Sequence, residues 1–127
     1  MKHTFLILLW FIVIRVSGQG NCDCSLADGK AGWSLLLQSP DKNCQALGYE
    51  VYAEELVKGK KLDSAMYCLE NALNFYLYSN CPPFRQAAVY KQIASIAEKK
   101  ADFSSALSFN LKALELAEKA NNGLERA

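Results

Sequence analysis

The strongest constraint on the fold of this chain is an internal repeat. Ten residues recur 41 positions further along the sequence. The recurring pairs are Gln45 and Gln86, Ala46 and Ala87, Tyr49 and Tyr90, Ala53 and Ala94, Lys58 and Lys99, Ser64 and Ser105, Ala65 and Ala106, Ala72 and Ala113, Leu73 and Leu114, and Asn80 and Asn121. A fixed period of about 20–50 residues is typical of stacked repeat proteins. The period therefore predicts an extended surface of the kind that holds other polypeptides, and it favours binding over catalysis.

The spacing of apolar residues predicts helices, and no strand pattern appears. Leu69, Ala72 and Tyr76, for example, follow one another at steps of three and four and share one helical face. The expected helices are a short one over Trp33–Gln38 and four longer ones over 40–58, 63–79, 83–100 and 103–120. We therefore predict an all-α fold, an α-solenoid of two antiparallel helix pairs preceded by a short lead-in helix.

The expected helix ends rest on capping residues. Ser39 is expected as the N-cap of the first long helix, with Pro40 at its first helical position. Asp63 and Asp102 are expected to cap the second and fourth long helices. Asn121-Asn122-Gly123 is expected to stop the fourth, because asparagine and glycine tolerate the left-handed conformation.

The repeated positions resemble the tetratricopeptide repeat, whose pattern is W-x2-L-G-x2-Y, then A-x3-F and a later proline. The first copy reads Tyr49-x2-Tyr52-Ala53-x2-Leu56, then Ala65-x3-Leu69-x2-Ala72. The second copy reads Tyr90-x2-Ile93-Ala94-x2-Ala97, then Ala106-x3-Asn110-x2-Ala113. The resemblance covers residues 44–121 and implies helix pairs whose first helices line a concave binding groove.

Three features depart from that pattern. The period is 41 rather than about 34, the proline that ends each repeat is missing, and Asn110 replaces the aromatic residue. The longer period resembles the variant found in kinesin-light-chain-like repeats. It is also similar to the extracytoplasmic repeat arrays of bacterial sensor kinases and regulators, as is the segment Ala-Leu-Glu-Leu-Ala-Glu-Lys at 113–119.

The N-terminus has the pattern of a secretory signal peptide. Lys2 and His3 precede an unbroken apolar run of ten residues, from Phe5 to Ile14, and small residues including Gly18 follow. The run is about half of the roughly 20 residues that a membrane span needs. We expect cleavage after Gly18 and an exported protein, periplasmic or secreted. The expected divisions are a signal peptide at 1–18, a lead-in segment at 19–39, repeats at 40–80 and 81–121, and the start of a third repeat at 122–127.

All five cysteines follow the expected signal peptide, at Cys22, Cys24, Cys44, Cys68 and Cys81. Export permits disulfides, and an odd count leaves at least one thiol free or paired between chains. The sequence leaves the connectivity open. Cys68 is expected in mid-helix, as part of the core. The pair Cys22-x-Cys24 lacks the C-x-x-C spacing of redox motifs, so we interpret it as disulfide partners or unstructured thiols rather than as a thiol enzyme's site.

Charge and composition exclude several classes of function. The net charge is +1, and removing Lys2 and Arg15 with the signal peptide leaves 12 basic and 13 acidic residues. Neither balance favours a nucleic-acid partner, which would want a basic patch. The only histidine is His3, so a mature Ser-His-Asp triad and a histidine metal site are excluded. We expect no enzymatic activity, no cofactor and no metal.

The resemblance implies that the first helix of each pair lines a groove for protein or peptide. The candidate partner-binding residues are Glu50, Glu54 and Lys58 in the first repeat and Lys91, Ser95 and Lys99 in the second. Each of them taken singly also fits a solvated helix face. The lysine, asparagine and arginine arrangement of the known carboxylate clamp is not reproduced, so a peptide carboxyl terminus is not specifically implied.

Two functions fit this sequence. The first is an exported, non-enzymatic scaffold module that binds protein or peptide and touches membranes only through its signal segment or a missing downstream part. The second is the N-terminal sensory region of a larger bacterial signalling protein. The alanine near the start of each repeat, Ala46 and then Ala87, would next recur at position 128, and about three repeats are needed for a stable stack. We therefore expect that the chain continues, or that another protein or a second copy covers an exposed apolar edge of helix 103–120.

Overall fold

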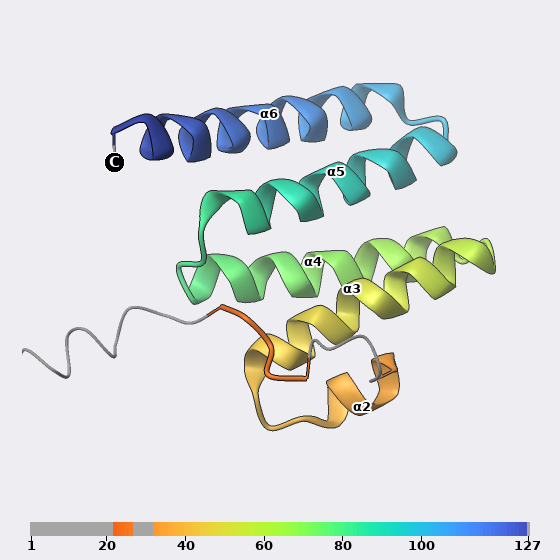
Figure 1. Ribbon diagram of the computed structural model, residues 1–127. Helices are drawn as coiled ribbons and strands as arrows, with labels where there is room; N and C mark the ends of the chain where they lie inside the picture. Colours follow the sequence, from red (N-terminus) through yellow and green to blue (C-terminus); the bar gives the residue numbers. More distant parts are fainter. Residues whose placement is uncertain (1–21, 27–31, 127) are drawn as a thin grey trace, which may run out of the picture.

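The computed structural model describes residues 22–26 and 32–126 of the chain. The described part contains a short helix followed by four long ones, stacked so that α2 and α6 lie at opposite edges (Figure 1). The bounds are α2 Trp33–Gln38, α3 Lys42–Lys58, α4 Leu62–Tyr78, α5 Pro83–Lys99 and α6 Phe103–Arg126. Each helix packs against the next one in the sequence. The all-helical prediction is thus confirmed for the described residues.

Two of the predicted helix starts are wrong by a few residues. Asp41, not Ser39, caps α3, because its carboxylate accepts a hydrogen bond of 2.9 Å from the Asn43 backbone. Ser39 instead accepts from the Asp41 backbone N–H at 3.1 Å and so shapes the turn between α2 and α3. Asp63 lies within the first turn of α4 and does not cap it. Asp102 does cap α6, since its carboxylate accepts from the Ser105 backbone at 3.2 Å.

The turns repeat along the chain as the sequence does. Lys60, in the α3–α4 turn, has a φ of 61°, and Ala101, 41 residues later, has a φ of 60° in the α5–α6 turn. The backbone hydrogen bonds around the two residues also correspond, for example Lys61 N–H to Leu56 and Asp102 N–H to Ala97. Left-handed residues at this position close the helix end and turn the chain back. The α4–α5 turn has the same geometry, with a φ of 53° at Asn80 and a hydrogen bond from the Cys81 N–H to Tyr76, so all three turns between the long helices share it.

The core lies between the helices at the small and large residues that the repeat predicts. Ala53, Ala65 and Ala72 are fully buried, and Leu69 and Tyr76 fill the space beside them. Small side chains at helix contacts let the axes approach closely, since the interaxial distance depends on the residues at the contact. The inward face predicted for the helix over 63–79, which is α4, is therefore confirmed.

The last helix departs from two expectations. Asn121-Asn122-Gly123 does not stop it, because α6 continues to Arg126. The apolar spacing of this helix predicts an inward face that contains Phe103, Leu107 and Leu114 together with Ala106 and Ala113. The two alanines are buried, but the three larger side chains are exposed, so the prediction is wrong for them. The expected apolar edge on this helix is present.

Two disulfides attach the lead-in segment to the helices. Cys22 is bonded to Cys81, in the turn between α4 and α5, and Cys24 is bonded to Cys44 in α3. Cys68 is the free cysteine and is buried in α4, as predicted. Burial raises the pKa of its thiol, which keeps the group protonated and unreactive.

The predicted signal peptide at 1–18 lies outside the described residues. Within the described ranges, none of the helices has both the length and the apolar character that a membrane span requires.

Candidate binding groove

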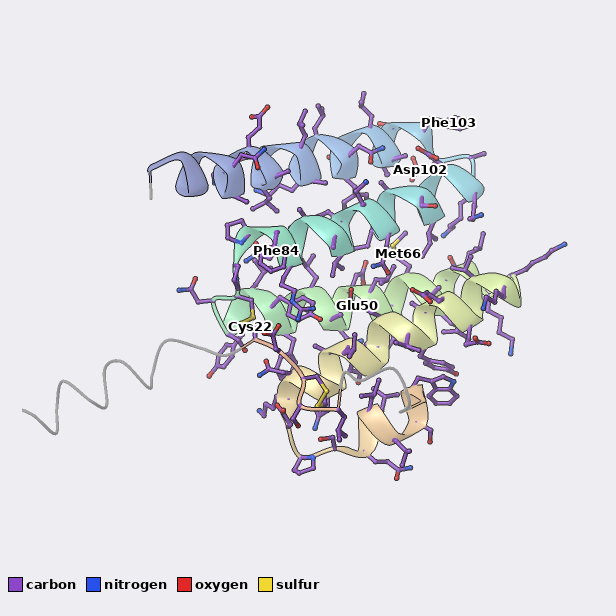
Figure 2. All side chains as sticks on the ribbon, in the orientation of Figure 1. Cys22, Glu50, Met66, Phe84, Asp102 and Phe103 are labelled. Atoms are coloured by element: carbon purple, nitrogen blue, oxygen red, sulfur yellow. A yellow bond between two sulfur atoms is a disulfide. The ribbon has the colours of Figure 1, made fainter. Side chains whose placement is uncertain are left out.

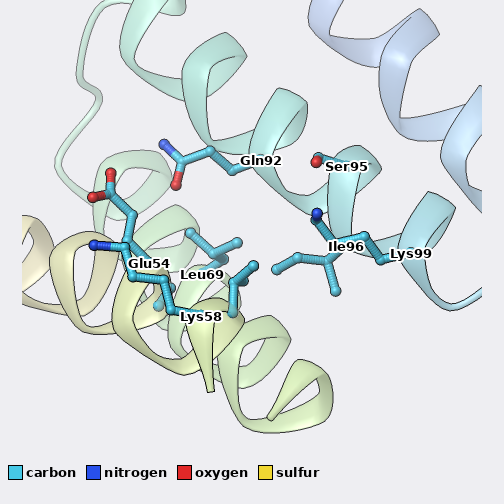
Figure 3. A pocket seen from close by; sticks show the side chains of 9 residues that line it. Glu54, Lys58, Leu69, Gln92, Ser95, Ile96 and Lys99 are labelled. Carbon is cyan, nitrogen blue, oxygen red and sulfur yellow. The ribbon is translucent and has the colours of Figure 1, made fainter. Parts of the chain in front are cut away.

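A groove lies between α3 and α5, the first helices of the two pairs. We call it the α3–α5 groove. It encloses about 360 Å³ and is lined by Ala53, Glu54, Val57, Lys58, Leu69, Gln92, Ser95, Ile96 and Lys99. Figure 3 shows Leu69 and Ile96 between Glu54 and Lys58 on one side and Gln92, Ser95 and Lys99 on the other. Four of the six residues predicted to bind a partner thus lie together in one concave site.

The floor of the groove is apolar because α4 lies beneath both of its walls. Leu69 of α4 is almost fully buried, and Ala53 of α3 and Ile96 of α5 meet it from either side. The small Ala53 side chain leaves open the space that a larger residue would fill. Apolar floors with a few polar groups at the rim are typical of sites that hold ligands.

Charged side chains stand at the rim of the groove. Glu54, Lys58 and Lys99 are all exposed, and Lys58 forms an ion pair of 3.5 Å with Glu55, one turn of helix before it. Ion pairs at this exposure contribute little to stability and exchange readily with other partners. Both lysines therefore remain available to an acidic group on a ligand, and Glu54 to a basic one.

Glu50, also predicted to bind a partner, has a different environment. Its carboxylate accepts a hydrogen bond from the Tyr76 hydroxyl at 2.5 Å and one from the Gln92 amide at 3.3 Å. Figure 2 places Glu50 in the middle of the stack. Burial raises the pKa of this carboxyl, against the lowering effect of the two hydrogen bonds and of Arg85. Glu50 thus ties α3 to α4 and α5 beside the groove and does not line it.

Lys91, the sixth predicted residue, lies in another hollow. This α5–α6 hollow encloses about 450 Å³ and is lined by Phe84, Ala87, Ala88, Lys91, Asn110, Ala113, Leu114 and Ala117. Lys91 and Ser95 are both exposed on α5, yet they belong to the two different concavities. The structure therefore does not bring Lys91 together with Lys58 and Lys99.

Sequence reasoning did not predict the other five residues that line the groove, which are Ala53, Val57, Leu69, Gln92 and Ile96. Leu69 and Ile96 make its floor, and Gln92 lines its wall while bonding Glu50. Leu69 was predicted only as a core residue, since a helical face pattern does not say which part of a core remains open to ligand. No pattern in the sequence marks Gln92, whose partner is 42 positions away.

The lining of the α3–α5 groove offers carboxylate, ammonium, amide and hydroxyl groups and contains no cysteine or histidine. Cys22 and Cys24 are bonded to different partners, so they are not a dithiol pair, in line with their interpretation as disulfide partners. In the part of the chain that the structure describes, no group of histidine, cysteine and acidic residues is arranged to hold a metal ion.

Comparisons of the chain with protein-family models, with curated proteins and with solved structures gave no match.

Proposed function

We propose that this chain is an exported, non-enzymatic module of the tetratricopeptide type, and that it binds protein or peptide in the α3–α5 groove. One observation carries the proposal: Glu54, Lys58, Ser95 and Lys99, singled out from sequence as groove residues, line one concavity with an apolar floor. They come from helices that are separated in the sequence by the whole of α4.

The repeated architecture supports the tetratricopeptide type. The chain has two successive helix pairs with matching left-handed turns 41 residues apart. The groove lies between the first helices of those pairs, where the family resemblance implies it. Stacked pairs of this kind form curved surfaces whose specificity comes from the side chains that line them.

The two disulfides support export. Disulfides form and persist in secreted and periplasmic proteins and are rare in the cytosol. Four of the five cysteines are paired. Together with the signal pattern at 1–18, these bonds favour an oxidising compartment.

The lining indicates the chemistry of the ligand. Leu69 and Ile96 offer contact for an apolar side chain, while Lys58 and Lys99 offer ammonium groups at the rim. A peptide with an apolar residue flanked by an acidic one would satisfy both features. Glu54 would favour a basic residue at the opposite flank, because opposite charges across an interface set orientation and partner choice.

A displayed library of random peptides provides the test. Peptides are selected on the chain with its disulfides formed and are then measured by calorimetry. The double variant Glu54→Lys, Lys99→Glu exchanges the rim charges and keeps the net charge. We expect it to lower the affinity for the selected peptides at least about tenfold, or roughly 1.4 kcal/mol.

The matched control exchanges charges away from the groove, in the double variant Glu70→Lys, Lys112→Glu. Both of these side chains are exposed and neither lines the groove. The control should bind the selected peptides as the unmodified chain does. Equal binding to both double variants, or a selection that yields no binding peptide, would refute the proposed groove.

A further inference from the structure

An exposed flank of α6, beside the α5–α6 hollow, carries an apolar stripe. Its members follow one another at alternating steps of four and three residues, and they are Phe103, Leu107, Asn110, Leu114 and Ala117. Steps of this kind place side chains on one side of a helix. Phe103 is 69% exposed, Leu107 61% and Leu114 56%. Large apolar side chains gathered on one exposed face mark an interaction surface.

The internal repeat identifies the type of surface that this stripe represents. Its counterparts in α4, 41 residues earlier, are Leu62, Met66, Leu69, Leu73 and Tyr76. All five are buried in the core or packed against it, and α5 packs on α4 as the next helix of the stack. The stripe on α6 thus corresponds to a helix–helix interface, and its matching occupant is another helix.

The stripe is complementary to itself when two copies run antiparallel. With a two-fold axis at Asn110, Phe103 of one copy faces Ala117 of the other, because each lies seven residues from the axis. Leu107 and Leu114 face each other within about one residue rise of 1.5 Å. The large Phe103 side chain then meets the small Ala117 side chain, and the two leucines pack against each other in the seam.

Asn110 favours a second copy over an unrelated apolar helix. Its side-chain amide is both a donor and an acceptor, so two such amides on the axis can bond each other. An apolar partner would bury the amide without a hydrogen bond, at a cost of about 1–3 kcal/mol. A single asparagine within an apolar seam is also a known means of fixing register in paired helices. We propose that two copies of this chain associate through α6 in an antiparallel pair whose two-fold axis lies at Asn110.

The α5–α6 hollow adds contact surface for the second copy. It runs beside the stripe and shares Asn110, Leu114 and Ala117 with it. Phe84, near the start of α5, lines this hollow and is 58% exposed. Phe103 is the first residue of α6 (Figure 2). Side chains from α6 of the second copy would fill this hollow. One pair of helices is a small interface, so we expect a weak, concentration-dependent dimer.

Disulfide trapping tests the position of the axis. In the variant Asn110→Cys the two introduced thiols meet on the axis, and mild oxidation should convert the chain to a linked dimer. Ser108→Cys, exposed on the same helix but off the stripe, should remain monomeric under the same conditions. No linked dimer from Asn110→Cys, or equal linking in the two variants, would overturn the proposal.

Sedimentation equilibrium tests the surface without introduced cysteines. The average mass of the unmodified chain should rise with concentration, and Leu107→Lys should abolish the rise because it places two ammonium groups in the seam. Leu77→Lys, at an exposed leucine of α4, is the matched control and should retain it. A mass that stays at the monomer value, or a rise that survives Leu107→Lys, would contradict the proposed dimer. Circular dichroism confirms that each variant keeps its helices.

Discussion

Glu50 is the residue whose chemistry differs most from what its place in the sequence suggests. Its hydrogen-bond partners, Tyr76 and Gln92, lie 26 and 42 positions away. The Arg85 guanidinium, itself bonded to Asp23 at 2.6 Å, lies over the Tyr76 ring. Burial and the Glu50 charge raise the pKa of Tyr76 well above its ordinary range. The tyrosine therefore stays a hydrogen-bond donor at every physiological pH.

This environment predicts a pH dependence of stability. Burial is the largest effect on Glu50 and raises its pKa above the ordinary 4.5. The folded state then binds the proton more tightly than the unfolded state, so the free energy of unfolding should fall as pH rises from about 4.5 through the folded pKa. Glu50→Gln should remove this contribution to the fall, as measured by urea unfolding at a series of pH values.

The matched control for this prediction is Glu70→Gln, which changes an exposed carboxylate on α4. It should leave the pH dependence of the unmodified chain in place. If the free energy of unfolding of Glu50→Gln changes with pH in parallel with that of the unmodified chain, ionisation of Glu50 does not destabilise the folded state.

At the scale of elements, α2 is held against α3 by a close approach at Gly48. A Cβ atom at this position would lie 3.0 Å from both the Leu36 Cβ and the Leu37 backbone nitrogen. Alanine is favoured over glycine within a helix by about 1 kcal/mol, but here it would push on the backbone of α2. Overpacking of this kind costs about 1–3 kcal/mol.

We therefore expect Gly48→Ala to destabilise the fold by about 1 kcal/mol net, measured as a loss in the free energy of unfolding. Gly59→Ala is the matched control, because its Cβ would meet its nearest atoms at 3.7 Å, an ordinary contact. We expect that control to change stability by less than about 0.5 kcal/mol. Stabilisation by Gly48→Ala would mean that α2 shifts without cost.

The sequence predicts the helices well because their signals are local and repeated. The alanines and the apolar faces lie within single helices and recur at one fixed offset, and the structure has helices at those places. The predicted stop at 121–123 fails for a physical reason. One glycine costs a helix only about 1 kcal/mol, and α6 runs on to Arg126.

The groove is less accessible to sequence reasoning than the helices. The family resemblance predicts Glu54, Lys58, Ser95 and Lys99 as groove residues on the first helix of each pair, and all four line the α3–α5 groove. Glu50 was placed beside them because helical spacing gives a face but not the direction of its neighbours. Its buried bond to Tyr76 depends on how α4 packs against α3, which no local pattern encodes.

At the scale of the whole molecule, the disulfides hold one end of the stack. Cys22–Cys81 joins residues 59 apart, and Cys24–Cys44 joins residues 20 apart. Cys24, Cys44 and Leu36 form a small core of their own beneath α2. A domain of this size is stabilised by only about 5–15 kcal/mol in total, so two cross-links make up a large share of it.

The two disulfides should therefore contribute unequally to stability. In the chain-entropy account, closing the longer loop stabilises by roughly 4 kcal/mol and closing the shorter one by roughly 3 kcal/mol. The variant Cys22→Ser, Cys81→Ser should thus lower the free energy of unfolding more than Cys24→Ser, Cys44→Ser, measured by urea unfolding without reductant. Both variants also disturb buried core residues, because Cys22 and Cys81 belong to the main cluster and Cys24 and Cys44 to the small one around Leu36. Since Cys68 forms no disulfide, Cys68→Ala should lower the free energy of unfolding only through the loss of packing contacts. If reductant leaves the free energy of unfolding of the unmodified chain unchanged, the disulfides do not stabilise the stack.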